Sequence, residues 1–96
     1  MDRIDHVAIV VKDLEETLTW YLSHFNAKLI YQDDTWAMIE FQNIKLAFVV
    51  PHQHPPHIAF NSEKAESFGK LKQHRDGTVS CYAKDPSGNI VEFIKP

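Results

Sequence analysis

The chain has 96 residues and is poor in cysteine, in glycine and in long apolar runs. Since its single cysteine cannot form a disulfide within the chain, the sequence fits a reducing compartment, and we expect a cytoplasmic protein. No apolar segment approaches the roughly 20 residues that cross a bilayer, and the first residues resemble no signal peptide. The three glycines are scattered, so no glycine-rich loop is available to bind phosphate.

The chain also has no large excess of positive or negative charge. Ten basic and thirteen acidic residues give a net charge of −3, without the basic stripe that a nucleic-acid partner requires. A hydrophobic content of 44% is ordinary for a globular protein. A chain of this length forms one domain with one modest core. Histidine is unusually frequent, with six residues in the chain.

The first half of the chain predicts a β-α-β-β-β unit. Residues 4–11 alternate as a strand does, and Asp13 with Glu16 three residues later forms a capping box that predicts the start of a helix. Apolar residues at helical spacing indicate that this helix faces a sheet and ends near residues 24–26. Further strands are expected at 28–32, 36–41 and 44–50.

The second half predicts a shorter copy of the same unit. A proline-rich segment over 51–56 separates the halves, and the strand that opens His57-Ile-Ala-Phe resembles the earlier His6-Val-Ala-Ile. We expect a helix at 63–74 and no room for a strand directly after it. The remaining expected elements are a turn at Asp76-Gly77 and strands at 78–83 and 90–95.

Two histidines and a glutamate are candidate metal ligands. His6 and His57 each open a strand, and Glu92 lies within a short apolar strand, where a carboxylate is costly to bury without a positive partner. By alternation, His6 shares its face with Ala8, and His57 shares its face with Ala59, so small neighbours leave space above the sheet. Two imidazoles and one carboxylate form a common metal-binding set.

Three segments in this order resemble the vicinal oxygen chelate superfamily of glyoxalases, bleomycin-resistance proteins and extradiol dioxygenases. They are Asp5–Leu14, His57–Phe60 and Tyr82–Phe93, and the resemblance runs almost from end to end. It implies a single α+β domain over residues 1–96, built of two fused βαβββ-type units over about 1–50 and 57–96. The second unit would be abbreviated, and the mixed sheet would curve into a cup with the helices outside.

The resemblance also implies a function. His6, His57 and Glu92 would hold a divalent Fe²⁺, Mn²⁺, Ni²⁺ or Zn²⁺ ion, and a small substrate would chelate that metal through adjacent oxygens. We therefore favour a metal-dependent lyase or dioxygenase, with no catalytic residue identified. In the family a fourth ligand often comes from the last strand of the first unit. That position falls here on Lys45 or Ala47, neither a plausible ligand, which disfavours a glyoxalase proper.

Several alternatives remain open at these positions. Glu92 could simply pair with a lysine such as Lys45. Glu40, on the neighbouring expected strand, could supply a fourth ligand, and His54 is the nearest substitute for the third ligand. Cys81 has no histidine nearby in its expected strand, so a nucleophilic role is not predicted.

A second function remains possible, namely metal-independent sequestration of a planar small molecule, as in bleomycin-resistance proteins. Tyr31, Trp36 and Tyr82 could line a pocket for such a ligand, or they could equally be core or dimer contacts. We expect a homodimer, because an absent edge strand would leave unpaired backbone that a second copy could cover. No nucleic-acid or membrane partner is expected.

Overall fold

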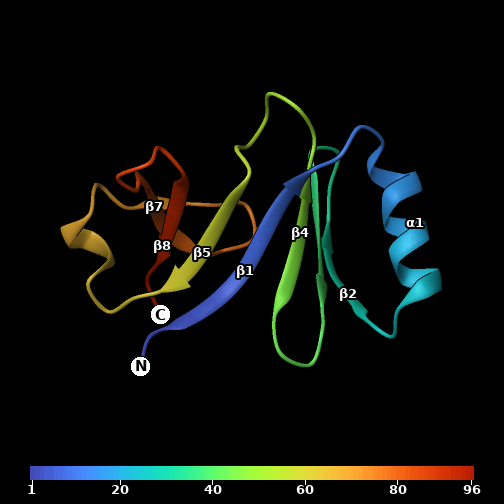
Figure 1. The fold of residues 1–96 in the computed structure, drawn as a ribbon, viewed down its shortest axis with the longest axis horizontal. Coiled ribbons are helices and arrows are strands. Elements are labelled where there is room, and N and C mark those ends of the chain that lie inside the picture. The colour runs from blue at the N-terminus through green and yellow to red at the C-terminus, as the bar shows by residue number, and fades with distance from the viewer. The chain divides into compact units, whose positions relative to one another are not determined.

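The computed structural model describes all 96 residues, which Figure 1 colours by residue number, and the chain divides into two units. One unit comprises His6–Pro56, and the other comprises His57–Pro96 together with Met1–Asp5. The α+β class and the two units of βαβββ type predicted from the sequence are confirmed, with a 3-10 turn in place of the helix in the second unit.

The chain alternates strands with one helix and one helical turn. The elements are β1 (Arg3–Val10), α1 (Leu14–His24), β2 (Lys28–Gln32), β3 (Trp36–Glu40), β4 (Lys45–Val49), β5 (His57–Asn61), η1 (Ala65–Ser67), β6 (Lys72–Gln73), β7 (Val79–Lys84) and β8 (Ile90–Ile94). The strand bounds predicted for both halves are confirmed to within one residue, apart from β6, which was not predicted. No helix has the length and apolar character needed to cross a membrane.

The unit His6–Pro56 has the sheet order β2-β3-β4-β1, with β1 parallel to β4 and the other neighbours antiparallel. The helix α1 packs on β3 and β4. Alternation along the strands gives this sheet two apolar faces. On one face Ala37, Ile39 and Phe48 form a buried cluster with Val11 and with Leu14 and Leu18 of α1. The opposite face contains Ala8, Met38, Ala47 and Val49.

The start of α1 is defined by the predicted cap. Asp13 has extended backbone angles, and its carboxylate accepts a hydrogen bond of 2.9 Å from the Glu16 N–H. The bond satisfies one of the amide groups that the first turn leaves without a helical partner. Glu15 and Glu16 also place negative charge at the positive end of the helix dipole.

Replacing Asp13 by alanine is expected to lower the free energy of unfolding by about 1 kcal/mol, because the first turn loses its side-chain cap. Urea denaturation followed by circular dichroism measures the change. The exposed neighbour Lys12 is the matched control, and Lys12→Ala should leave the midpoint almost unchanged. Equal effects of the two substitutions would contradict the assignment of the cap.

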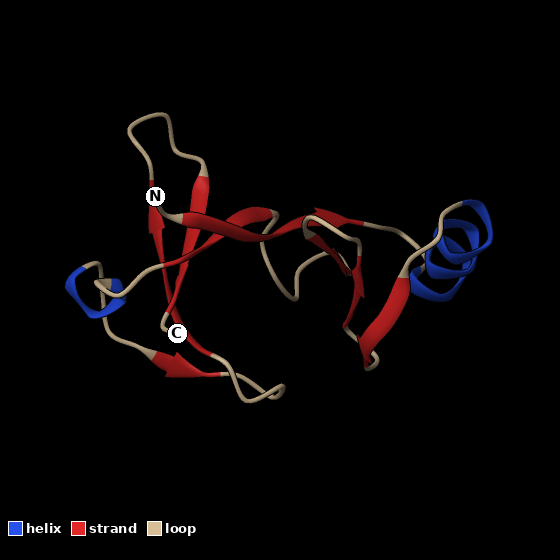
Figure 2. Cartoon of the chain, turned by 90° about the horizontal axis from the view of Figure 1, so that it is seen from below, coloured by secondary structure: helices blue, strands red, loops and turns tan.

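The unit that contains His57–Pro96 has the sheet order β5-β8-β7-β6, with β5 parallel to β8 and the remaining pairs antiparallel. Two predictions for this unit are wrong. The expected helix at 63–74 is a single 3-10 turn, η1, and the chain does make a further strand, β6, which pairs Lys72 and Gln73 with β7. Figure 2 shows the contrast between the several turns of α1 and the one turn of η1.

The physical reason lies in the middle of the expected helix. Gly69 there costs about 1 kcal/mol in helical propensity relative to alanine, and the apolar stripe is too sparse to offset that cost. Instead Phe68 stacks on Phe93 with ring centroids 3.9 Å apart. The Cβ and Sγ atoms of Cys81 lie 3.6 Å and 3.7 Å from the position that a Cβ atom on Gly69 would occupy. The backbone that follows gains more from pairing with β7 than from continuing a helix.

Candidate functional site

The carboxylate of Glu92 is the centre of the buried polar cluster in the second unit. Its strand β8 alternates, which places Glu92 on one face with Ile90 and Ile94. In the sheet Glu92 lies opposite Ala59 of β5 and opposite Tyr82 of β7, and it is only 5% exposed. The small Ala59 side chain leaves room for the carboxylate, as the alternation pattern predicts.

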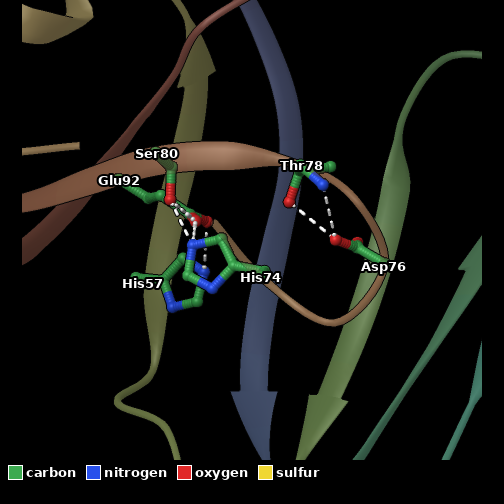
Figure 3. Close-up of polar contacts among 6 residues, drawn as sticks. All are labelled: His57, His74, Asp76, Thr78, Ser80 and Glu92. Atoms are coloured by element: carbon green, nitrogen blue, oxygen red, sulfur yellow. Dashed lines mark hydrogen bonds and ion pairs between the residues drawn. The ribbon is translucent and has the colours of Figure 1, made fainter. Parts of the chain in front are cut away.

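His57 meets Glu92 within this unit. The Nε2 atom of His57 lies 3.0 Å from the Oε1 atom of Glu92, and both side chains are buried (Figure 3). Two atoms bound at a right angle to one metal, each at about 2.1 Å, are also separated by about 3.0 Å. The two atoms are therefore close enough for a hydrogen bond in the free protein, and the pair also suits two ligands to one metal.

The other oxygen of Glu92 is held by two residues that the sequence prediction missed. The Ser80 hydroxyl donates a hydrogen bond of 2.6 Å to Oε2 of Glu92, and Nε2 of His74 lies 2.5 Å from the Ser80 oxygen. The same His74 nitrogen is 3.5 Å from Oε2 of Glu92. Alternation along β7 could have identified Ser80, because Ser80 shares a face with Tyr82, the residue opposite Glu92. His74 could not be identified in this way, because it lay within the wrongly predicted helix.

A tight hairpin turn positions His74 next to Ser80. The His74 N–H donates to the Thr78 carbonyl at 2.8 Å, and the Gly77 N–H donates to the His74 carbonyl at 3.0 Å. Gly77 has a φ of +91°, which a residue with a side chain rarely adopts. Asp76 fastens the turn further by accepting hydrogen bonds from both the N–H and the hydroxyl of Thr78 (Figure 3). The predicted Asp76-Gly77 turn is confirmed.

His6, the third predicted ligand, lies in the unit His6–Pro56 and is also buried. In the parallel pair of β1 and β4 it stands opposite Lys45, and Ala8 stands opposite Ala47. Lys45 and Ala47 therefore share the face of His6, as expected for the position of a fourth ligand. Glu40 pairs with Lys45 but is exposed.

The predicted aromatic residues divide between the two units. In the first, Tyr31 stacks on Trp36 with ring centroids 4.2 Å apart, and the Tyr31 hydroxyl donates to Asp33 at 2.6 Å. Burial opposes the ionisation of Asp33, but hydrogen bonds from Tyr31, Thr35 and Trp36 outweigh it and lower its pKa to about 2. The hydrogen bonds to Asp33 thus hold the Tyr31–Trp36 pair in place beside the turn that contains Asp33. The ring of His54 meets Trp36 edge-on.

In the second unit, Tyr82 borders the polar cluster. Its ring meets the His57 ring edge-on, with centroids 5.2 Å apart. Burial, together with the negative charges of Glu92 and Asp76, raises the pKa of the Tyr82 phenol above its ordinary value. The phenol is therefore neutral near pH 7 and can donate a hydrogen bond but cannot serve as a base.

Cys81 lies on the opposite face of β7 from Tyr82. Its thiol is buried and donates to the Ala65 carbonyl at 3.3 Å. Burial and the nearby Glu92 carboxylate raise the pKa of this thiol. Because the nucleophilic form is the thiolate, this environment agrees with the prediction that Cys81 is not a nucleophile.

Comparisons with known proteins concern most of the chain. The family model described as glyoxalase/bleomycin resistance protein/dioxygenase superfamily matches residues 3–93, whereas no curated protein matches the sequence. Methylmalonyl-CoA epimerase from Mycobacterium tuberculosis has a similar structure, with a TM-score of 0.77 and 14% identity over 98% of this chain and 87% of that one. A superfamily member from Vibrio splendidus superposes with a TM-score of 0.73 and 8% identity over the whole of both chains.

The Mn(II)-bound glyoxalase from Novosphingobium aromaticivorans is a further similar structure. Its TM-score is 0.70 at 13% identity, and the match covers 99% of this chain and 40% of that one. At these low identities the similarity establishes the fold alone.

Proposed function

We propose a metal-dependent function for this chain, which belongs to the glyoxalase/bleomycin resistance protein/dioxygenase superfamily. His6, His57 and Glu92 would hold the metal, and all three are buried and offer one ligand atom each. This donor set suits Fe²⁺, Mn²⁺, Ni²⁺ or Zn²⁺. The observation that carries the proposal is the buried His57–Glu92 pair, whose donor atoms are already at a separation that one ion can bridge.

A metal bound there would supply a Lewis acid and a template that orients two adjacent oxygens of a small substrate. The residues of the chain limit how many ligands the protein provides. Lys45, when cationic, offers no lone pair, and Ala47 has no donor atom. A three-residue set consequently leaves coordination positions for the substrate, and the burial of the three side chains keeps competing water away from the ligand atoms.

A metal-independent binder of planar molecules is the second candidate. The stacked pair of Tyr31 and Trp36 favours it, because a rigid aromatic pair offers a flat apolar surface, and aromatic contacts add about 0.5–1.5 kcal/mol each beyond area burial. In that function the protein would bind a small molecule without chemistry, and for either candidate we expect a homodimer.

Titration with divalent metals tests the first candidate. After removal of bound metal with a chelator, we expect one equivalent of at least one of the four ions to bind with a dissociation constant below about 1 mM, or about −4 kcal/mol. His57→Ala and His6→Ala should each weaken binding, because each removes one ligand. His24→Ala is the matched control, since His24 is exposed on α1. Absence of binding by the unaltered protein would contradict the proposed function.

Ligand binding separates the two candidates. A catechol, an α-keto acid or a hydroxamate, each of which chelates through two oxygens, should bind to the metal-loaded protein and not after chelation. Fluorescence of the two tryptophans, Trp20 and Trp36, provides the signal. Binding of planar compounds that persists after chelation and is lost in Trp36→Ala would instead support the second candidate.

A further inference from the structure

The Ser80 and His74 side chains form a chain of hydrogen bonds behind Glu92, and from this we propose that both are positioning residues for a metal-binding carboxylate. The inference rests on the proposed function. Ser80 lies on β7 and is 1% exposed, while His74 follows β6 and its side chain is 21% exposed. All three residues belong to the same unit, and Figure 3 shows them converging on one carboxylate oxygen.

The direction of the hydrogen bonds follows from counting protons. The Ser80 hydroxyl has one hydrogen and donates it to Oε2 of Glu92. The 2.5 Å contact between Ser80 and His74 therefore needs a hydrogen on Nε2 of His74, which makes that nitrogen the donor. A nitrogen that carries a hydrogen has no lone pair for a metal, so the Nε2 atom of His74 orients Ser80 and is not available as a ligand atom.

The two carboxylate oxygens of Glu92 have different partners. Oε2 is occupied by the short, charge-assisted bond from Ser80, whereas Oε1 faces His57 at 3.0 Å. Oε1 is accordingly the oxygen through which Glu92 would hold a metal. Hydrogen-bond partners behind a ligating carboxylate hold it in its productive orientation, and their loss typically weakens metal binding 10–100-fold.

The short edge strand of the second unit also bears on the position of His74. Strand β6 has only two paired residues, Lys72 and Gln73, and both are exposed, so it buries little apolar surface. The hairpin turn that joins it to β7 nevertheless fixes His74 directly beside Ser80. We infer that this hairpin serves to position His74.

The test compares metal affinity with the stability of the metal-free protein. Ser80→Ala and His74→Ala are each expected to raise the dissociation constant 10–100-fold. His74→Gln should retain affinity within a few-fold of the unaltered protein, because the glutamine amide still provides an N–H donor. His24→Ala and Ser87→Ala, at exposed positions, are the controls. Calorimetry gives the dissociation constant, and thermal unfolding without metal gives the stability.

The dissociation constants and the thermal stabilities together test the inference. An unchanged dissociation constant in both alanine variants, with or without lower thermal stability, would overturn the inference, while the proposed function would stand. Absence of metal binding by the unaltered protein would overturn the proposed function and the inference together. If Ser80→Ala does not fold, the comparison of His74→Ala with His74→Gln decides, because His74 is partly exposed and its loss leaves no closed cavity.

Discussion

Replacing Glu92 by glutamine is expected to weaken divalent-metal binding more than 100-fold, beyond the 10–100-fold range typical of residues behind the ligands. The substitution keeps the shape of the side chain but removes the negative charge and the Oε1 ligand beside His57. The Ser80 hydroxyl can still donate to the amide oxygen, so the local packing is retained.

Calorimetric titration of the metal-free variant measures this loss. The control is Glu63→Gln, which makes the same chemical change at an exposed position. Circular dichroism of both variants verifies that the fold is unchanged. A dissociation constant for Glu92→Gln equal to that of the unaltered protein would mean that the Glu92–His57 pair is only structural.

Replacing Phe48 by alanine is expected to lower the free energy of unfolding by about 3–5 kcal/mol, which is a large part of the roughly 5–15 kcal/mol that stabilises a domain. Phe48 is 0% exposed and packs against α1, with its ring centroid 4.8 Å from that of Tyr21. The loss of this side chain leaves a cavity between the helix and the sheet, and the rigid strands around it cannot close that cavity.

Urea denaturation measures the effect, with thermal unfolding as a second readout; the midpoint should fall by about 4–8 °C for each kcal/mol lost. Phe25→Ala is the matched control, because Phe25 is 47% exposed in the same unit and its truncation leaves no closed cavity. Equal losses of stability in the two variants would contradict the assignment of Phe48 to the core.

Local patterns were sufficient to predict much of this chain. Alternation with a period of two placed Glu92 on a buried face of β8 and placed His6 and Ala8 on the same face of β1. This works because successive side chains on a strand point to opposite sides of the sheet. The Asp13 cap was equally predictable, because it depends on residues three apart. The membership in the superfamily followed from three short segments in their order.

Residue patterns along the chain are therefore enough to define every strand except β6, the face on which each candidate ligand lies, and the unsuitability of Lys45 and Ala47 as a fourth ligand. The pairing of residues after Gly69 with β7 depends on the tertiary structure, because Gly69 weakens a helix locally but the strand that replaces it needs a partner distant in the chain. The same pairing brings His74 to Ser80, and Ser80 donates to Glu92, twelve residues further along. No local pattern encodes that hydrogen-bonded chain, because it exists only when three strands lie side by side.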